Sequence, residues 1–540
     1  MKHLHFIYTL LFGVAVLLFF GLAYPHHLHY QEQYQLFLFD NTYMWEIVKL
    51  PGGVADLLGR FCTQFFLFSW VGAFIIGLLL SAVQFLTYQQ VKNRTSQAAN
   101  TSEAWLYGLS FVPSFLLWLF LLDENALLGG VWAVLLTLLA SWVFDMATNK
   151  REKKACLDSS EREHARPKAE ISSGWTRRIL LIAAVPILYW MVGPVCLVFF
   201  LLQATRPKLA AWHIGVLVLL ALMPIILSLY LPVPASSLWF GIHYHRYPTE
   251  VPVLLWAASL SIIVLTLIAY VANKREKNQD MPKVKASSHY VVTLCSFALV
   301  AIVMGGLVWK NCNFKAEKVM QYDFMARFQQ WNRILATISA EKPNNQIGVT
   351  VQNLALAMHG QLADHLFDYN QNGISGLLPD VERDATSPLP TAEAFYQLGM
   401  INVAQRSVFE AQEAILDFQK SARCYKRLAE TNLINGNYEV ARKYLKTLQK
   451  TLFYREWANE TLPLLGDEKA IAKHPEYGHL RQMAYNDNFF FSDHTTAEML
   501  ESLFFSNTDN RLAFEYLKAY YMLTGDRDSY ARLLLHLQKQ

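Results

Sequence analysis

The sequence predicts an all-α protein with two parts, a polytopic helical membrane bundle at residues 1–311 and a soluble helical domain at residues 312–540. Two observations predict this fold class. Up to Trp309, apolar stretches of about 20 residues, the length that crosses a bilayer, follow one another. Beyond Asn313 no such stretch occurs, and charged residues recur every few positions. The chain therefore changes solvent at about Cys312.

The composition narrows the class of partner. Hydrophobic residues make up 53% of the 540-residue chain, and the formal net charge is only +4. Because this small charge is gathered in the loops beside apolar stretches, it indicates topology and argues against a nucleic-acid partner. The six cysteines form no Cys-x-x-Cys pair and no cluster with histidine. The sequence therefore predicts neither a metal site nor a disulfide framework, and it identifies no cofactor.

Eight apolar stretches are candidate membrane spans. They lie at residues 5–24, 61–86, 104–122, 126–146, 179–203, 209–231, 251–272 and 290–309. The first stretch is interpreted as an uncleaved signal anchor, because residues 22–25 make a poor small-residue cleavage site and further spans follow it.

The positive charges set the expected topology. Lysine and arginine collect at residues 150–178 and 273–289, and such clusters mark cytoplasmic loops. Three single crossings between the two clusters would place them on opposite sides of the membrane. A helical hairpin at residues 179–204 that turns at Gly193 and Pro194 removes this conflict and gives about nine passes. One long kinked helix in this segment is the alternative.

With the hairpin, the N-terminus is cytoplasmic and the C-terminal domain lies outside, which in a bacterium means an inner-membrane protein with a periplasmic domain. Residues 25–60 and 232–250 then lie on the same outer side. The first of these loops is rich in Phe, Leu, Tyr and Trp, so we expect it to lie along the membrane surface as short amphipathic helices. Glu32 and Asp40 would then reach the bilayer interface.

Carboxylates at the interface, close to histidine and arginine, are suited to transfer from a lipid-phosphate carrier. The carboxylate accepts a proton from the acceptor or helps to hold a metal, and the cations offset the charge of the departing phosphate. The candidate catalytic residues are Glu32 and Asp40, and the candidate ligand-binding residues are Arg60, His243, His245 and Arg246. The competing interpretation is that interfacial Tyr, Trp and His only anchor the protein in the membrane.

The membrane half resembles polytopic glycosyltransferases that use polyprenyl-linked sugars. In those enzymes an acidic residue follows the first span in an outer loop that lies partly along the membrane, and a periplasmic domain ends the chain. Glu32 and Asp40 are the positions that match the acidic residue, but the paired acidic motif of such enzymes is absent. The whole chain resembles still more an uncharacterised family of Bacteroidota inner-membrane proteins with a helical tail. That second resemblance implies topology and no activity.

The soluble part shows a pattern of helix pairs. Its clearest unit covers residues 425–453, where Ala429 and Ala441 allow two helices to approach and Gly436 permits the turn between them. This is the tetratricopeptide pattern. Weaker matches surround Gly399 and Gly525, so the sequence predicts a divergent tetratricopeptide-like domain that stacks into a solenoid with a concave surface.

Two functions stay open after the sequence is read. One is a non-catalytic envelope scaffold, in which the spans anchor a helical domain that binds a protein partner. The other is a glycosyltransferase that takes its sugar from a lipid-linked donor at the first outer loop. Transport is less favoured, because few ionisable residues lie within the spans. In either case the lipid bilayer is one partner of the protein.

Overall fold

The computed structural model describes residues 2–95, 101–160, 166–205, 211–278, 286–380, 384, 386–416, 419–485 and 496–538. Within these residues every named element is helical, so the predicted all-α class is confirmed. The chain forms two compact units. The first contains Met1–Leu28 and Asp40–Asn313, and the second contains His29–Phe39 and Phe314–Gln540.

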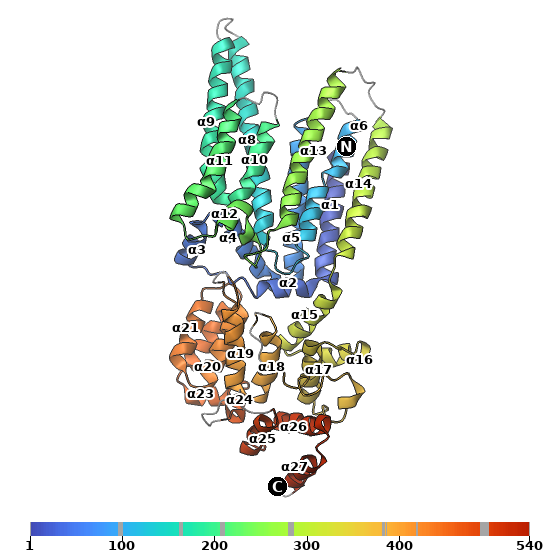
Figure 1. The fold of residues 1–540 in the computed structure, drawn as a ribbon, viewed down its shortest axis with the longest axis vertical. Helices are drawn as coiled ribbons and strands as arrows, with labels where there is room; N and C mark the ends of the chain where they lie inside the picture. The colour runs from blue at the N-terminus through green and yellow to red at the C-terminus, as the bar shows by residue number, and fades with distance from the viewer. Residues whose placement is uncertain are drawn as a thin grey trace. The chain divides into compact units, whose positions relative to one another are not determined.

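The first unit is a bundle of long helices (Figure 1). Its elements are α1 (Lys2–Leu18), η1 (Phe19–Ala23), the first half of α2 (Pro25–Glu32), α3 (Asn41–Val48), α4 (Gly53–Thr63), η2 (Gln64–Leu67), α5 (Ser69–Lys92), α6 (Thr101–Leu109), α7 (Val112–Phe120), α8 (Leu128–Ser160), α9 (Arg166–Val192), η3 (Gly193–Cys196), α10 (Leu197–Ala204), α11 (Ala211–Tyr230), α12 (Ala235–Phe240), η4 (Ile242–Tyr244), α13 (Val253–Asn278) and α14 (Ala286–Lys310).

Seven helical stretches among the described residues are long and apolar enough to cross a membrane. They are His3–Ala23, Ser69–Lys92, Glu103–Phe120, Leu128–Thr148, Arg178–Ala204, Val253–Arg275 and Tyr290–Lys310, and a shorter apolar helix covers Ile214–Tyr230. Each matches one of the predicted spans. The largest difference is the start of α5, which the sequence placed at residue 61. The backbone is extended at Phe68 and ends η2 there, so that α5 begins at Ser69.

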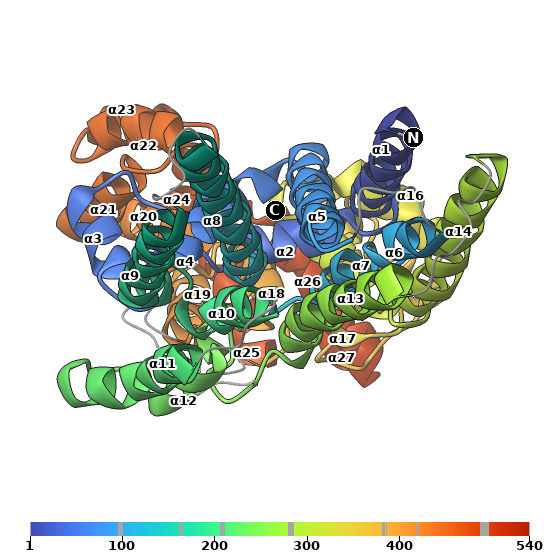
Figure 2. The same cartoon turned by 90° about the horizontal axis from the view of Figure 1, so that it is seen from above.

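Close helix packing in the bundle depends on small residues. Figure 2 shows α4 beside α8 and α1 beside α5, and the contacts agree. A Cβ atom on Gly59 would lie only 2.4 Å from the backbone nitrogen of Gly129, so glycine at both positions lets α4 and α8 approach. This contact fixes α4, which carries Arg60, against the N-terminal end of α8.

The segment at 179–204 is broken at Gly193. This residue has φ of 58°, in the left-handed region that favours glycine, and it separates α9 from α10 through η3. The turn is held where the hydroxyl of Tyr244 donates to the carbonyl of Val192 at 3.0 Å. The end of α10 is held where Arg94 Nη2 donates to the carbonyl of Leu202 at 2.7 Å.

The second unit is a separate helical domain. Its elements, besides the second half of α2, are α15 (Phe314–Arg327), α16 (Trp331–Ala340), α17 (Gln346–Met358), η5 (Leu366–Asp368), α18 (Pro388–Leu398), α19 (Ile401–Glu413), α20 (Ala422–Ile434), α21 (Tyr438–Leu448), α22 (Arg455–Thr461), η6 (Leu462–Leu464), α23 (Glu468–Lys473), α24 (Tyr477–Met483), α25 (Thr496–Ser506), α26 (Arg511–Thr524) and α27 (Arg527–Gln538).

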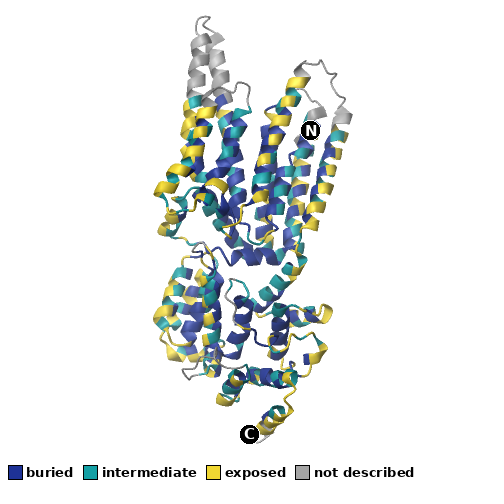
Figure 3. Cartoon of the chain, viewed as in Figure 1, coloured by how far each residue is buried: buried dark blue, intermediate teal, exposed yellow. Residues whose placement is uncertain are grey.

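Three helix pairs turn where the sequence has the predicted glycines. The pairs are α18 with α19, α20 with α21, and α26 with α27, and their turns contain Gly399, Gly436 and Gly525, all with positive φ. Figure 3 shows α18 and α20 largely in the colour of buried residues, whereas α27 is mostly exposed or intermediate. One apolar cluster runs from Tyr322 to Leu533 and so joins α15 to α27. Smaller apolar clusters lie beside it, one between α20, α21 and α22 and another between α18, α19 and α20.

Candidate functional site

One short segment of the first predicted loop, residues 29–39, belongs to the second unit. Its backbone is hydrogen-bonded there. The amide of Leu36 donates to the carbonyl of Lys420 at 2.9 Å, and the amide of Phe39 donates to the carbonyl of Lys450 at 2.7 Å. The side chain of Leu36 is buried in an apolar cluster formed with α20, α21 and α22. The segment is thus a structural part of this domain.

Glu32 lies in that segment and is only 4% exposed. Arg327 donates to its Oε2 from Nη1 and Nη2 at 3.3 and 3.4 Å. The hydroxyl of Tyr454 donates to Oε1 at 2.9 Å and accepts from Arg327 Nη2 at 2.6 Å. Burial raises the pKa of Tyr454, so its hydroxyl stays protonated and keeps donating to Glu32. Both oxygens of the carboxylate are occupied by groups of the same domain.

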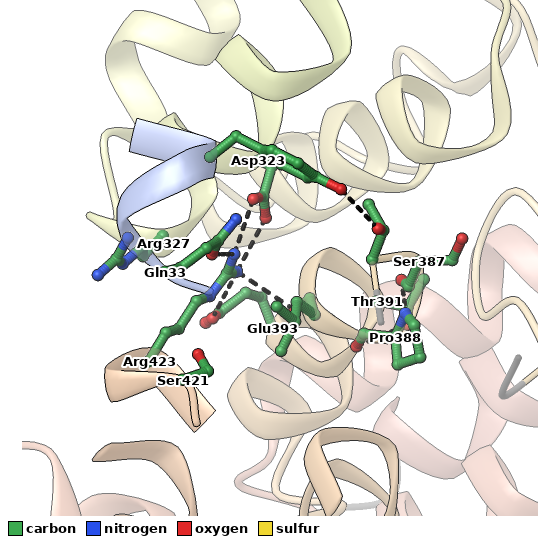
Figure 4. A network of polar contacts seen from close by, with 12 residues as sticks. Gln33, Asp323, Arg327, Ser387, Pro388, Thr391, Glu393, Ser421 and Arg423 are labelled. Carbon is green, nitrogen blue, oxygen red and sulfur yellow. Dashed lines mark hydrogen bonds and ion pairs between the residues drawn. The ribbon is translucent and has the colours of Figure 1, made fainter. Parts of the chain in front are cut away.

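The neighbouring residue Gln33 joins a second arginine (Figure 4). Arg423 is 5% exposed and binds both oxygens of Asp323, at 2.7 and 2.8 Å. Its Nη1 also donates to Gln33 Oε1 at 3.1 Å, and its Nη2 lies 3.4 Å from Glu393 Oε1. Paired bonds between a guanidinium and a carboxylate are strong and directional. Arg423, on α20, therefore ties α15, α18 and the residue that follows α2 to its own helix.

A third arginine continues the network on the same face of α20. Arg427 donates to Glu393 Oε2 at 2.6 Å and to Glu430 Oε2 at 2.9 Å. Its guanidinium lies over the ring of Tyr396, 3.6 Å from the centroid. Burial raises the pKa of Glu430, against the opposing effect of Arg427.

The network is close to electrically balanced. It contains three arginines and four carboxylates, namely Arg327, Arg423, Arg427, Glu32, Asp323, Glu393 and Glu430. Lys426 adds a partly exposed positive charge 3.7 Å from Glu430. Breaking a buried pair by removing one partner leaves an uncompensated charge and typically costs about 3–5 kcal/mol. We name this set the buried charge network; its geometry suits it to fix the second unit in one arrangement.

Asp40 belongs to the first unit and caps α3. Its Oδ1 accepts from the amides of Thr42 and Tyr43, at 3.0 and 3.2 Å. A side chain at this position satisfies amides that the helix itself leaves without partners. Asp40 and Glu32, which the sequence analysis placed at one site, thus have separate surroundings in the two units.

A polar cluster in the first unit does include two of the predicted ligand-binding residues. Arg60 Nε lies 3.0 Å from both oxygens of Asp56, one turn earlier on α4, and its Nη2 lies 2.9 Å from Oδ2. Arg60 is also hydrogen-bonded to the hydroxyl of Tyr43. His243 completes the cluster, and burial lowers its pKa to about 4 although Asp56 opposes this. We name these four residues the Arg60 cluster.

The position of His243 depends on Gly52. A Cβ atom on Gly52 would lie 2.6 Å from His243 Nε2, and Gly52 has φ of 80°, so only glycine fits. His243 Nε2 is buried and has no hydrogen-bond partner within the described part of the chain. The histidine is therefore held as a neutral ring beside an arginine and a carboxylate.

The other two predicted residues lie on the same loop but in a different environment. His245 Nε2 is 3.0 Å from Asp123 Oδ2. Burial opposes protonation of His245, but the hydrogen bond to Asp123 outweighs it and raises the pKa of the imidazole. Arg246 is 4% exposed, and its amide donates to the carbonyl of Asn125 at 2.8 Å.

The sequence analysis did not identify the residues that pair with Arg60 in the first unit or those of the buried charge network in the second. Asp56 and Arg60 are spaced by four residues, which is the signal of a helical ion pair. Arg423, Arg427 and Glu430 have the spacing of one buried helix face, which was a detectable sign of an internal ion-pair network. Within the described residues no group of three or more His, Cys, Asp or Glu side chains is placed to hold a metal ion.

Comparison with known proteins gives one match, to a protein family, and it covers almost the whole chain. A comparison with curated proteins and one with solved structures find no match. A family whose description reads "Family of unknown function (DUF6057)" matches residues 1–539. Because this match covers nearly every residue of both units, the chain belongs to the family of unknown function DUF6057.

Proposed function

We propose that this protein is a bacterial inner-membrane scaffold of the Bacteroidota envelope, anchored by its apolar helices, whose periplasmic, tetratricopeptide-like tail binds a protein partner or an extended ligand. Three helix pairs with glycine turns support a repeat-type tail. The predicted partners are the lipid bilayer and an envelope protein, and the proposal requires no cofactor.

One observation carries the proposal. The carboxylate of Glu32, which made catalysis at the first outer loop attractive, is buried and bonded on both oxygens by Arg327 and Tyr454. A general base must reach the proton that it takes up, and this carboxylate is shielded by its own domain. The residues that follow Glu32 are also bound within the second unit, which favours assembly of a binding domain over exposure of a reactive group.

The test replaces the three polar partners together by apolar residues of similar size. In the triple variant Glu32→Met, Arg327→Met, Tyr454→Phe no unpaired charge is left in the core, and replacement of a buried ion pair by apolar residues is often neutral or stabilising. We expect this variant to fold and to retain every protein that co-purifies with the full-length wild-type chain. Retained protection of α20 against hydrogen exchange serves as the folding control.

The outcome distinguishes scaffold from enzyme. A folded triple variant that keeps its partners but loses a cellular glycan would overturn the scaffold proposal, because it would show that Glu32 is needed for chemistry. Loss of partners in a variant whose α20 stays protected would also count against the structural role assigned to Glu32.

A second candidate is a glycosyltransferase that uses a polyprenyl-linked sugar donor. The Arg60 cluster favours it, since it combines an arginine, a carboxylate and a neutral histidine, the groups that support proton transfer and charge stabilisation. Its test is His243→Gln, which should abolish glycan formation if the cluster is catalytic. Unchanged glycans in this variant would refute catalysis by the Arg60 cluster, and the scaffold would remain as the proposed function.

A further inference from the structure

A groove lies between α1 and α5 in the first unit. It has a volume of about 260 Å³ and is lined almost entirely by apolar side chains. Five of these are large and 42–68% exposed, namely Phe6, Leu10, Val14, Phe74 and Leu78. Since both helices are among those long and apolar enough to cross a membrane, this groove would open toward lipid.

The small residues in the groove lie where α1 and α5 pack against each other. A Cβ atom on Gly77 would lie 2.9 Å from the carbonyl oxygen of Gly13, and one on Gly13 would lie 2.6 Å from Ser81 Oγ. These positions therefore allow α1 and α5 to approach each other. They are not available for close packing with a further helix, which favours a flexible chain as the occupant.

A second cavity of about 250 Å³ continues the groove toward the end of α5, and the two share Phe6 and Thr9. Its inner wall is polar but satisfied within the bundle. The hydroxyl of Thr9 donates to Gln84 Oε1 at 2.7 Å, and that of Tyr107 donates to the carbonyl of His5 at 2.6 Å.

The rim of the second cavity carries a positive charge. Lys92 is exposed, and its Nζ lies 6.0 Å from the ring centroid of Tyr88. Gln89 lies one turn before Lys92 and lines the same cavity. The nearby carboxylate of Glu103 accepts the hydroxyl of Tyr88 at 3.0 Å. Lys92 and Gln89 therefore offer donors to an anion at the mouth of the cavity.

We propose that the two cavities bind a membrane lipid with an anionic phosphate headgroup, its head at Lys92 and Gln89 and one chain along the groove. From Lys92 to Phe74 the helix rises about 27 Å. One lipid chain spans only about half of the hydrocarbon core, which is roughly 30 Å thick, so a whole chain fits along this length. The two cavities share no lining residue with the Arg60 cluster or with the tail, and the inference does not depend on the proposed scaffold function.

The experiment uses the full-length protein in detergent and native mass spectrometry, which counts bound lipids and protein copies together. Phosphatidylglycerol, phosphatidylcholine and glycerol phosphate are titrated. We expect phosphatidylglycerol to bind about five-fold more tightly than phosphatidylcholine, the ratio expected for one lysine near the headgroup. Glycerol phosphate, which lacks chains, should not bind.

Two variants locate the site. Lys92→Gln should weaken phosphatidylglycerol binding about five-fold, whereas the matched control Lys274→Gln, at the end of α13, should leave it unchanged. Leu78→Trp should fill the groove and weaken both lipids, whereas Leu267→Trp, on an exposed position of α13, should weaken neither. An unchanged unfolding temperature shows that each variant is folded.

Several results would overturn the proposal. If Lys92→Gln bound phosphatidylglycerol as tightly as the wild type does, Lys92 would not be part of a headgroup site. If Leu78→Trp kept its bound lipid, the lipid chain would not lie in the groove. Binding of glycerol phosphate as tight as that of the lipid would show a site for a soluble anion. Conversion of a dimer to a monomer by Leu78→Trp would show that a second copy of the chain occupies the groove.

Discussion

Substitution of Arg423 by glutamine tests the buried charge network most severely. Arg423 is 5% exposed and makes paired bonds of 2.7 and 2.8 Å to Asp323, with a further bond of 3.1 Å to Gln33. Arg423→Gln leaves the carboxylate of Asp323, whose side chain is only 16% exposed, without its paired cation. Loss of one partner of a buried pair costs about 3–5 kcal/mol. We expect amides of α20 that exchange through opening of the second unit to exchange roughly 10²–10⁴-fold faster, as measured by hydrogen exchange of the full-length protein.

Two comparisons give this experiment its control. Arg442 and Glu439 form an ion pair at 3.6 Å whose side chains are 38% and 85% exposed, so Arg442→Gln should cost no more than about 1 kcal/mol. The double variant Arg423→Met, Asp323→Leu removes both charges and should recover most of the protection. If Arg423→Gln and Arg442→Gln had equal effects, the network would not stabilise the domain.

Three further predictions concern the first unit. Asp40→Ala removes the cap of α3 and should lower its local stability by about 1 kcal/mol, measured by hydrogen exchange; an unchanged α3 would contradict the capping role. Burial lowers the pKa of His243, and likewise of His27, to about 4, so between pH 6.5 and 4 the unfolded chain binds more protons than the folded one. Stability should therefore fall as the pH is lowered through this range, and less steeply in His243→Gln; identical pH profiles in a thermal unfolding series would refute this. Gly59→Ala forces α4 from α8 and should cost about 1–3 kcal/mol, whereas Gly305→Ala, which meets no atom within 4 Å, should not lower the unfolding temperature.

The fold class followed from local patterns because hydrophobic length and helix-turn chemistry are local. Each apolar stretch of the sequence reappears as a helix, with Tyr290–Lys310 matching the predicted 290–309 almost residue for residue. The start of α5 was misplaced because the apolar run continues through η2, and hydropathy does not register the extended backbone at Phe68. The glycine turns at Gly399 and Gly436 were visible for the same local reason.

The surroundings of the candidate site residues were not predictable in this way. Glu32 was expected at the bilayer interface, yet both Glu32 and Gln33 are buried, because their partners Arg327 and Arg423 lie about 300 and 390 residues later. Pairing across such separations leaves no trace in periodicity or spacing. Arg60 and His243 were identified as polar outer residues, but the close approach of His243 to Gly52, at the start of α4, depends on the left-handed backbone of that glycine.

The central claim is that residues 29–39 form part of the second unit, and site-specific photo-crosslinking tests it most directly. Leu38 is partly buried against the apolar cluster of Ala422, Leu445 and Leu448, so it tolerates replacement by the photoreactive amino acid benzoylphenylalanine. Irradiation of the full-length protein should yield crosslinked peptides from α20, α21 and α22, identified by mass spectrometry. Crosslinks confined to residues 40–313 or to lipid would contradict the account.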